Sequence, residues 1–225
     1  MSSRLMTGLA LLALAANAAG LRAQAEPISL AGRHHLTLSA GLSGTSRAST
    51  SVGVSGVVVE SGASSLSGGV GYAYWLDNRL AVGVRALAVD VSADVSTTGV
   101  GTRATSGIVA AVLVGARYQL ARLTASNALR PYVAVGVGPL LGSADAVTAG
   151  LPTTVTTVRQ TAPSALVTLG ADLSLGARVT LGVDAGYLVA ADFDQPIGAR
   201  TNYSDPVFTL SLGVLLGSGR AARVK

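Results

Sequence analysis

The side chains that could do chemistry are few, and the two histidines come first among them. His34 and His35 are adjacent, and successive side chains of a strand point to opposite faces, so the pair cannot hold one metal ion in a strand. Ser39 lies four residues after His35. This is about 13 Å along a strand, too far for the hydrogen-bonded nucleophile and base of acyl transfer. We therefore expect no enzyme activity, no metal site and no cofactor.

Four charged residues within apolar segments are the remaining candidates. Asp184 lies in the middle of VTLGVDAGYLV (179–189), and Asp172, Arg85 and Arg117 have similar surroundings. A carboxylate buried without a partner is strongly unfavourable, so the chain must offer Asp184 either water or a counter-charge. Such a group of residues could be a catalytic cluster, an ion path or a structural charge network. The choice depends on the elements that position them.

Composition narrows the class of protein. The chain is 49% hydrophobic and only 12% charged, with a mean hydropathy of +0.53, whereas a soluble domain carries roughly twice that charged fraction. There is no cysteine, which excludes disulfides and Cys-ligated metals. The net charge is +5, two units of which come from Arg4 and Arg22. The remaining excess is too small and too dispersed to indicate nucleic-acid binding.

The N-terminal residues have the organisation of a secretory signal. Arg4 supplies positive charge, the apolar stretch LALLALAANAAG (9–20) follows, and AQA (23–25) is a small-x-small cleavage site. The apolar stretch is shorter than the roughly 20 residues of a membrane-spanning helix. We therefore predict a signal peptide over 1–25, a barrel over 26–217 and a short basic tail over 218–225.

Apolar and polar residues alternate with a period of two through most of the chain, which indicates an all-β protein. The alternation predicts eight strands, over 34–43, 65–76, 80–95, 106–120, 130–142, 164–176, 179–193 and 206–216. The connections alternate between short or moderate turns and longer polar loops, the longest over 44–64 and 143–163. Within the first of these, 51–60 is itself strand-like. Short turns at one end and long loops at the other are typical of an outer-membrane barrel.

The strands divide into two faces that differ in chemistry. In 179–193 one face carries Val, Leu, Ala and Tyr, and the other carries Thr, Gly and Asp184. The polar faces hold Gly, Ser, Thr and Ala with Arg85, Arg117, Asp172 and Asp184, and they lack the many Lys and Glu of a water-facing surface. An eight-stranded barrel has an interior just wide enough to be filled by side chains. We therefore predict a polar lumen in which Asp184 pairs with Arg117 or Arg85, and an aliphatic exterior in contact with lipid.

The strand alternation, the signal peptide and the sequence RPYVAVGVG (130–138) after GARYQL (115–120) resemble the small eight-stranded outer-membrane barrels of the OmpA/OmpX type. The resemblance covers the whole mature chain. It implies an eight-stranded antiparallel up-and-down transmembrane β-barrel in the outer membrane, inserted by the outer-membrane assembly machinery. Two features depart from the family: GSGRAARVK follows Leu216 in place of a C-terminal aromatic, and no peptidoglycan-binding domain follows the barrel.

Three functions remain open at this stage. The first is a non-enzymatic integral outer-membrane protein that supports the envelope or contacts other surfaces through its long loops. The second is a narrow channel for small solutes, and the third is a soluble exported barrel that binds an apolar ligand inside. Tyr72, Tyr74, Tyr118 and Phe208 are expected near the membrane interfaces as girdle residues. The loops give no indication of a particular partner.

Overall fold

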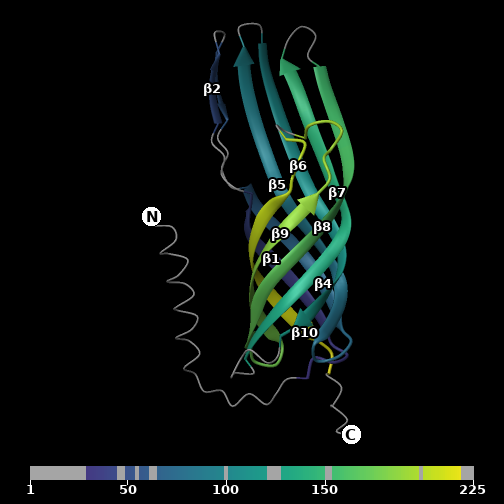
Figure 1. The fold of residues 1–225 in the computed structure, drawn as a ribbon. Coiled ribbons are helices and arrows are strands. Elements are labelled where there is room, and N and C mark those ends of the chain that lie inside the picture. Colours follow the sequence, from purple (N-terminus) through teal and green to yellow (C-terminus); the bar gives the residue numbers. More distant parts are fainter. Residues whose placement is uncertain are drawn as a thin grey trace, which may run out of the picture.

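The chain folds into a closed barrel of eight strands. The computed structural model describes residues 29–44, 49–53, 56–60, 65–98, 101–120, 128–149, 154–197 and 200–218. The strands are hydrogen-bonded in the order β1-β10-β9-β8-β7-β6-β5-β4, and a separate two-stranded sheet pairs β2 with β3 (Figure 1). Every neighbouring pair is antiparallel. The predicted eight-stranded antiparallel barrel is thereby confirmed, whereas the predicted signal peptide and basic tail lie almost wholly outside the described residues.

The strand bounds follow the sequence alternation closely. The elements are β1 His34–Ser43, β2 Ser49–Gly53, β3 Gly56–Glu60, β4 Ser65–Trp75, β5 Leu80–Thr98, β6 Gly101–Gln119, β7 Leu129–Ala149, β8 Thr154–Leu175, β9 Val179–Ala190 and β10 Asp205–Leu216. All eight predicted strands are present, and the strand-like stretch 51–60 is the β2–β3 hairpin. The described residues contain no helix that is long and apolar enough to cross a membrane.

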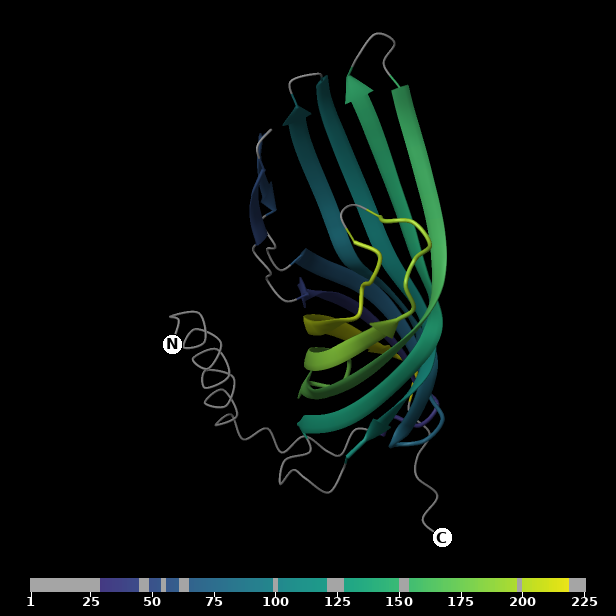
Figure 2. The same ribbon diagram turned by 45° about the horizontal axis from the view of Figure 1, so that its top comes forward.

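The prediction of a long loop over 143–163 is wrong, because most of this segment is strand. β7 continues to Ala149 and β8 begins at Thr154, and the β5–β6 hairpin likewise extends to Thr98 and Gly101. The Ser and Thr content of these segments was interpreted as loop composition, but Thr and Val are also good strand formers when a neighbouring strand pairs with them. The four strands β5 to β8 therefore project beyond the rest of the barrel as a sheet (Figures 1 and 2).

The two faces of the wall lie as the alternation predicts. Along β9, the residues from Leu181 to Val189 at odd positions are exposed, and Thr180, Asp184, Leu188 and Ala190 are buried. Closure pairs β1 with β10 along their whole length, from His34 opposite Leu216 to Ser43 opposite Val207. Because the barrel closes, the strands at its base leave no free edge whose N–H and C=O groups would meet lipid.

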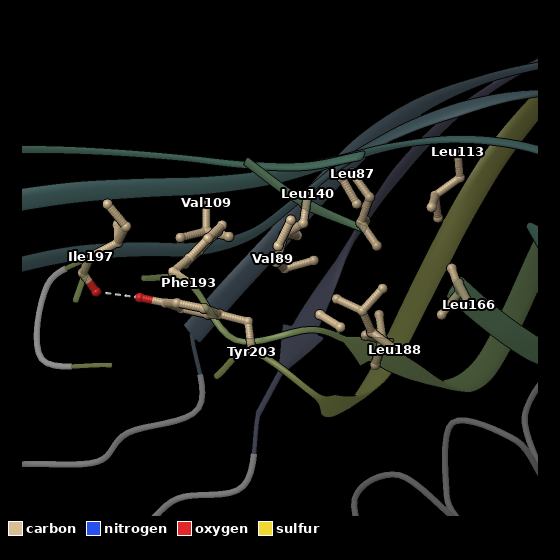
Figure 3. Packing of buried hydrophobic residues seen from close by; sticks show 14 of the residues in the cluster. Leu87, Val89, Val109, Leu113, Leu140, Leu166, Leu188, Phe193, Ile197 and Tyr203 are labelled. Carbon is tan, nitrogen blue, oxygen red and sulfur yellow. Dashed lines mark hydrogen bonds between the residues drawn. The ribbon is translucent and has the colours of Figure 1, made fainter. Parts of the chain in front are cut away.

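The prediction that small and polar side chains line the whole lumen is also wrong. Toward the projecting sheet, its inward positions carry large apolar side chains, among them Leu87, Val109, Leu140 and Leu188 (Figure 3). The prediction emphasised the Gly and Thr positions of each strand, although these leucines share the same inward parity. We call this set the apolar layer; its members are Leu87, Val89, Val109, Ala111, Leu113, Leu140, Ala144, Ala162, Leu166, Leu188, Ala190, Phe193, Ile197, Tyr203 and Val207.

The connection between β9 and β10 completes the apolar layer. Phe193 was predicted inside a strand, but β9 ends at Ala190, and Phe193, Ile197 and Tyr203 turn into the barrel mouth (Figure 3). The Phe193 and Tyr203 rings lie 5.7 Å apart between centroids, and the Tyr203 hydroxyl donates to the Ile197 carbonyl. Gly142 makes room for them, because a Cβ there would lie 3.0 Å from two ring carbons of Phe193.

The opposite end of the lumen, at the short turns, is closed by a second, smaller apolar set. Leu30, Trp75, Ala81 and Leu215 pack together there and are almost fully buried. Asp77, in the β4–β5 turn, accepts hydrogen bonds from the backbone N–H groups of Arg79 and Leu80 at 2.6 and 2.7 Å, which lowers the pKa of its carboxyl group. The barrel interior is thus layered from the turns to the projecting sheet as apolar, polar and apolar.

Candidate functional site

The polar layer between the two apolar sets holds all four predicted luminal charges. Asp184 lies at mid-strand on β9 and is only 4% exposed. Its Oδ1 lies 3.3 Å from Nη1 of Arg85 on β5, across the lumen. Its Oδ2 accepts a hydrogen bond from Thr209 Oγ1 at 2.8 Å and a longer one from the Tyr132 hydroxyl at 3.3 Å. The carboxylate therefore has one counter-charge and two neutral donors.

The register of the wall explains this arrangement. Thr209 on β10 lies directly opposite Asp184, and Gly170 lies opposite it on the other side, on β8. A Cβ at Gly170 would come within 2.6 Å of the Tyr132 hydroxyl, so glycine leaves the space through which Tyr132 reaches Asp184. Arg85 Nη2 also donates to Thr209 Oγ1 at 2.9 Å. Arg85, Asp184, Tyr132 and Thr209 thus form one connected network from four strands.

The other two predicted charges form a separate ion pair nearer the turns. Nη2 of Arg117 on β6 donates to Oδ2 of Asp172 on β8. The Arg117 guanidinium lies over the Tyr132 ring, 3.4 Å from its centroid, and 5.6 Å from the Trp75 ring. Tyr132 consequently joins the two ion pairs, since its ring contacts Arg117 and its hydroxyl contacts Asp184.

Sequence reasoning placed the four charges in the lumen but missed their neutral partners. Tyr132 shares a face with Ala134, Gly136, Gly138 and Leu140, and the same division by parity along 130–142 would have shown it. Thr209 could have been found in the same way from the final strand. The prediction left open whether Asp184 pairs with Arg117 or Arg85, and in the structure Arg85 is the partner.

The polar layer lines a small cavity. Its volume is about 140 Å³, and its lining includes Arg85, Arg117, Asp184, Thr168 and Ser211. Leu113 and Leu166 border it on one side and Ala81 on the other, so members of both apolar sets bound it. Arg117 Nε is buried and has no hydrogen-bond partner in the protein. A polar cavity of this size has room for a few water molecules that could accept from such a group.

The arrangement around the histidines does not assemble a nucleophile and a base. Nε2 of His35, which points into the barrel, lies 3.0 Å from Thr180 Oγ1, and Ser39 Oγ donates to the Gly69 carbonyl at 3.3 Å. His34 lies on the opposite, outer face, with Nδ1 2.7 Å from the Tyr72 hydroxyl. Among the described residues, no group of three or more His, Cys, Asp and Glu side chains could hold a metal ion.

The outer surface of the barrel is aliphatic all the way round. Each strand of the wall contributes exposed side chains such as Leu38, Val70, Val84, Val114, Val137, Leu169, Leu181 and Leu210. An apolar surface on all sides is far larger than the isolated patches of soluble monomers, and it is the surface expected of a barrel that spans a bilayer. It also rules out the soluble alternative, which needs the aliphatic face inside.

Aromatic side chains lie toward both ends of this outer surface. Tyr72, Tyr74 and Tyr118 are near the short turns, and the His34 and Tyr74 rings lie 5.2 Å apart between centroids. Phe208 is exposed near the other end of the wall, opposite Leu42. These are the positions that girdle residues take at the two membrane interfaces.

Comparison with known proteins finds similar folds and no related sequence. No protein-family model matches the chain, and no curated protein does. Solved structures with a similar fold include Ail, the attachment invasion locus protein of Yersinia pestis (13% identity, TM-score 0.48, covering 83% of this chain and 99% of Ail). Another is Neisserial surface protein A, with 17% identity and a TM-score of 0.46, covering 82% of this chain and 98% of that protein. A third is the outer membrane protein OprG from Pseudomonas aeruginosa, with 14% identity and a TM-score of 0.43, covering 83% of this chain and 96% of OprG.

These likenesses concern the fold. The resemblance to small eight-stranded outer-membrane barrels that the sequence indicates is confirmed at that level, because the chain itself forms a closed barrel of eight antiparallel strands.

Proposed function

We propose that this protein is an integral outer-membrane barrel with a non-enzymatic, structural role, and that it presents a four-stranded sheet at the cell surface. The observation that carries the proposal is the aliphatic outer wall around a lumen in which Arg85 pairs with Asp184 and Arg117 with Asp172. In water such a wall would be unstable, whereas in a bilayer it is the favourable arrangement.

The lumen supports a structural role rather than conduction. Arg85 neutralises Asp184 across the barrel, and Arg117 neutralises Asp172 two strands away. The apolar layer closes the space above both pairs. A solute would have to displace both an ion-pair network and packed leucines. We infer that the charges hold strands that are not neighbours in the wall to one another, β5 to β9 and β6 to β8, and do not form an ion path.

The orientation follows from the lengths of the connections. In outer-membrane barrels the short turns face the periplasm and the longer extensions face outward. The turns at Asp77 and at 176–178 then lie in the periplasm, and the projecting sheet of β5 to β8 lies outside the cell. This sheet offers backbone and side chains for contact with other surfaces, which a purely membrane-embedded barrel would lack.

The test is to express the full chain, separate the membranes, and compare boiled with unboiled detergent extracts on a gel. We expect a band in the outer-membrane fraction that changes mobility on boiling, because a closed barrel stays folded in detergent until it is heated. Release of the protein by salt or alkali without detergent would contradict the proposal. Surface digestion of intact cells should cut within the projecting sheet and leave the barrel protected.

A further inference from the structure

The projecting sheet has two free edges, one at β5 and one at β8. The β4–β5 ladder ends at the pair Gly68 and Ala88, and the β8–β9 ladder begins at Ser164 and Ala190. Ala191 N–H still donates to the Pro163 carbonyl at 3.0 Å. Within the described residues, no ladder therefore pairs with the outer side of β5 over 90–98 or of β8 over 154–162.

Neither edge carries the lysines or prolines that most often prevent strand pairing. The segments DVSADVSTT (90–98) and TVTTVRQTA (154–162) contain no Lys, Pro or Gly and are rich in Val and Thr. Sheets usually protect exposed edges with lysines, prolines or bulges, because unpaired N–H and C=O groups accept another strand. The register shift between Ala88 and Asp90 and the charges of Asp90, Asp94 and Arg159 protect these edges only in part. Two edges of nine residues each therefore remain able to pair with a further strand.

The membrane fixes which edges can meet. β5 runs from the short turns toward the tip of the projecting sheet, and β8 runs in the reverse direction (Figure 2). Two copies inserted the same way therefore bring β5 of one and β8 of the next together antiparallel, whereas β5 with β5 or β8 with β8 would be parallel. Antiparallel pairing is the more stable arrangement. The charges of the two edges are also opposite, since 90–98 contains two aspartates and 154–162 a single arginine.

We propose that copies of this chain associate side by side in one membrane, with the β5 edge of one copy paired to the β8 edge of the next. The inference rests on the proposed outer-membrane location, which gives all copies one orientation. Each copy offers one edge of each kind, so the contact is head-to-tail and continues from copy to copy as a ring or a row.

Cysteine cross-linking tests this directly, because the natural chain contains no cysteine. Ser96→Cys and Thr156→Cys lie opposite one another when the two edges overlap fully. The two variants are produced in the same cells and treated with a short bifunctional maleimide, whose reach includes diagonal neighbours about 7–8 Å apart. Gln195→Cys, exposed in the β9–β10 connection, replaces Ser96→Cys in the control mixture.

The head-to-tail contact predicts a covalent dimer, several-fold above the control, only when both variants are present. The double variant S96C/T156C should give a ladder of multimers. Adding Val155→Lys and Thr161→Lys to the Thr156→Cys copy should remove the cross-link, while the heat shift shows that the barrel still folds.

Two results would overturn the inference. One is a mixture of Ser96→Cys and Thr156→Cys that cross-links no more than the Gln195→Cys control. The partner of these edges would then be a strand of another protein and not a second copy of this chain. The other is equal cross-linking of Thr156→Cys with itself, which indicates a symmetric contact. A heat-modifiable outer-membrane protein without the cross-link would refute only this inference, whereas a protein absent from the outer membrane would refute the proposed function.

Discussion

The polar layer and the apolar layer occupy the same lumen, yet they hold the barrel together in different ways. Asp184 and Leu188 lie four residues apart on β9, on the same face. Asp184 depends on a few directional contacts with named partners, whereas Leu188 depends on packing against many neighbours. The polar layer should therefore fail abruptly when one partner is lost, and the apolar layer should weaken in proportion to the volume removed.

The largest effect is expected from Asp184→Leu. It leaves the Arg85 charge without its counter-ion, and breaking a buried ion pair by removing one partner costs about 3–5 kcal/mol. Because Arg85 is itself about one quarter exposed, the lower end of that range applies. The temperature at which the folded band disappears on a gel measures the loss. The double variant D184L/R85L serves as control and should recover much of the stability, since no unpaired charge remains.

Leu188→Ala should follow closely in size. Leu188 is fully buried, and truncating such a leucine costs about 2–4 kcal/mol through lost burial and the cavity left behind. Leu210→Ala is the matched control, because Leu210 is 65% exposed on the outer wall. Chemical unfolding in detergent or lipid measures both. Equal effects at the two positions would contradict the assignment of the inner and outer faces.

Thr209→Val should have a smaller effect, which separates the contribution of the Thr209 hydroxyl from that of the Arg85–Asp184 ion pair. It keeps the shape but removes the hydroxyl that donates to Asp184 and accepts from Arg85, a loss of about 1–2 kcal/mol. The effect should vanish in the D184L/R85L background, where both charged partners are gone. Persistence of the full effect there would mean that Thr209 acts through packing and not through the network.

The strands and their faces could be predicted from the sequence, whereas individual side-chain partners and the residues of the β9–β10 connection could not. Strict alternation fixed the strands and their faces, because a one-residue shift would turn every side chain to the other side. The partner of Asp184 could not be chosen between Arg85 and Arg117, because that choice depends on the stagger of the closed barrel. Phe193 was placed in a strand because the alternation was followed past the end of β9 at Ala190, and Ile197 was missed because it lies in an irregular connection with no period to follow.

The smallest expected effect is that of Asp77→Ala, in a turn outside the lumen. Like Asp184, Asp77 accepts two or more hydrogen bonds, but water reaches it, so the loss should stay below about 1 kcal/mol. Its pKa is lowered in the folded state by the Arg79 and Leu80 N–H groups. The contribution is therefore present above the ordinary pKa of 3.8 and lost as the pH falls through the lowered value. Unfolding of wild type and variant should converge in strong acid.

The most direct test of the account is the conductance of the purified wild-type barrel in a planar bilayer. Because packed leucines and paired charges fill the lumen, we expect a membrane that contains the heat-modifiable barrel to show no regular current steps. Steady, reproducible steps from the wild-type protein would contradict it, because ions would then be crossing both the polar and the apolar layer.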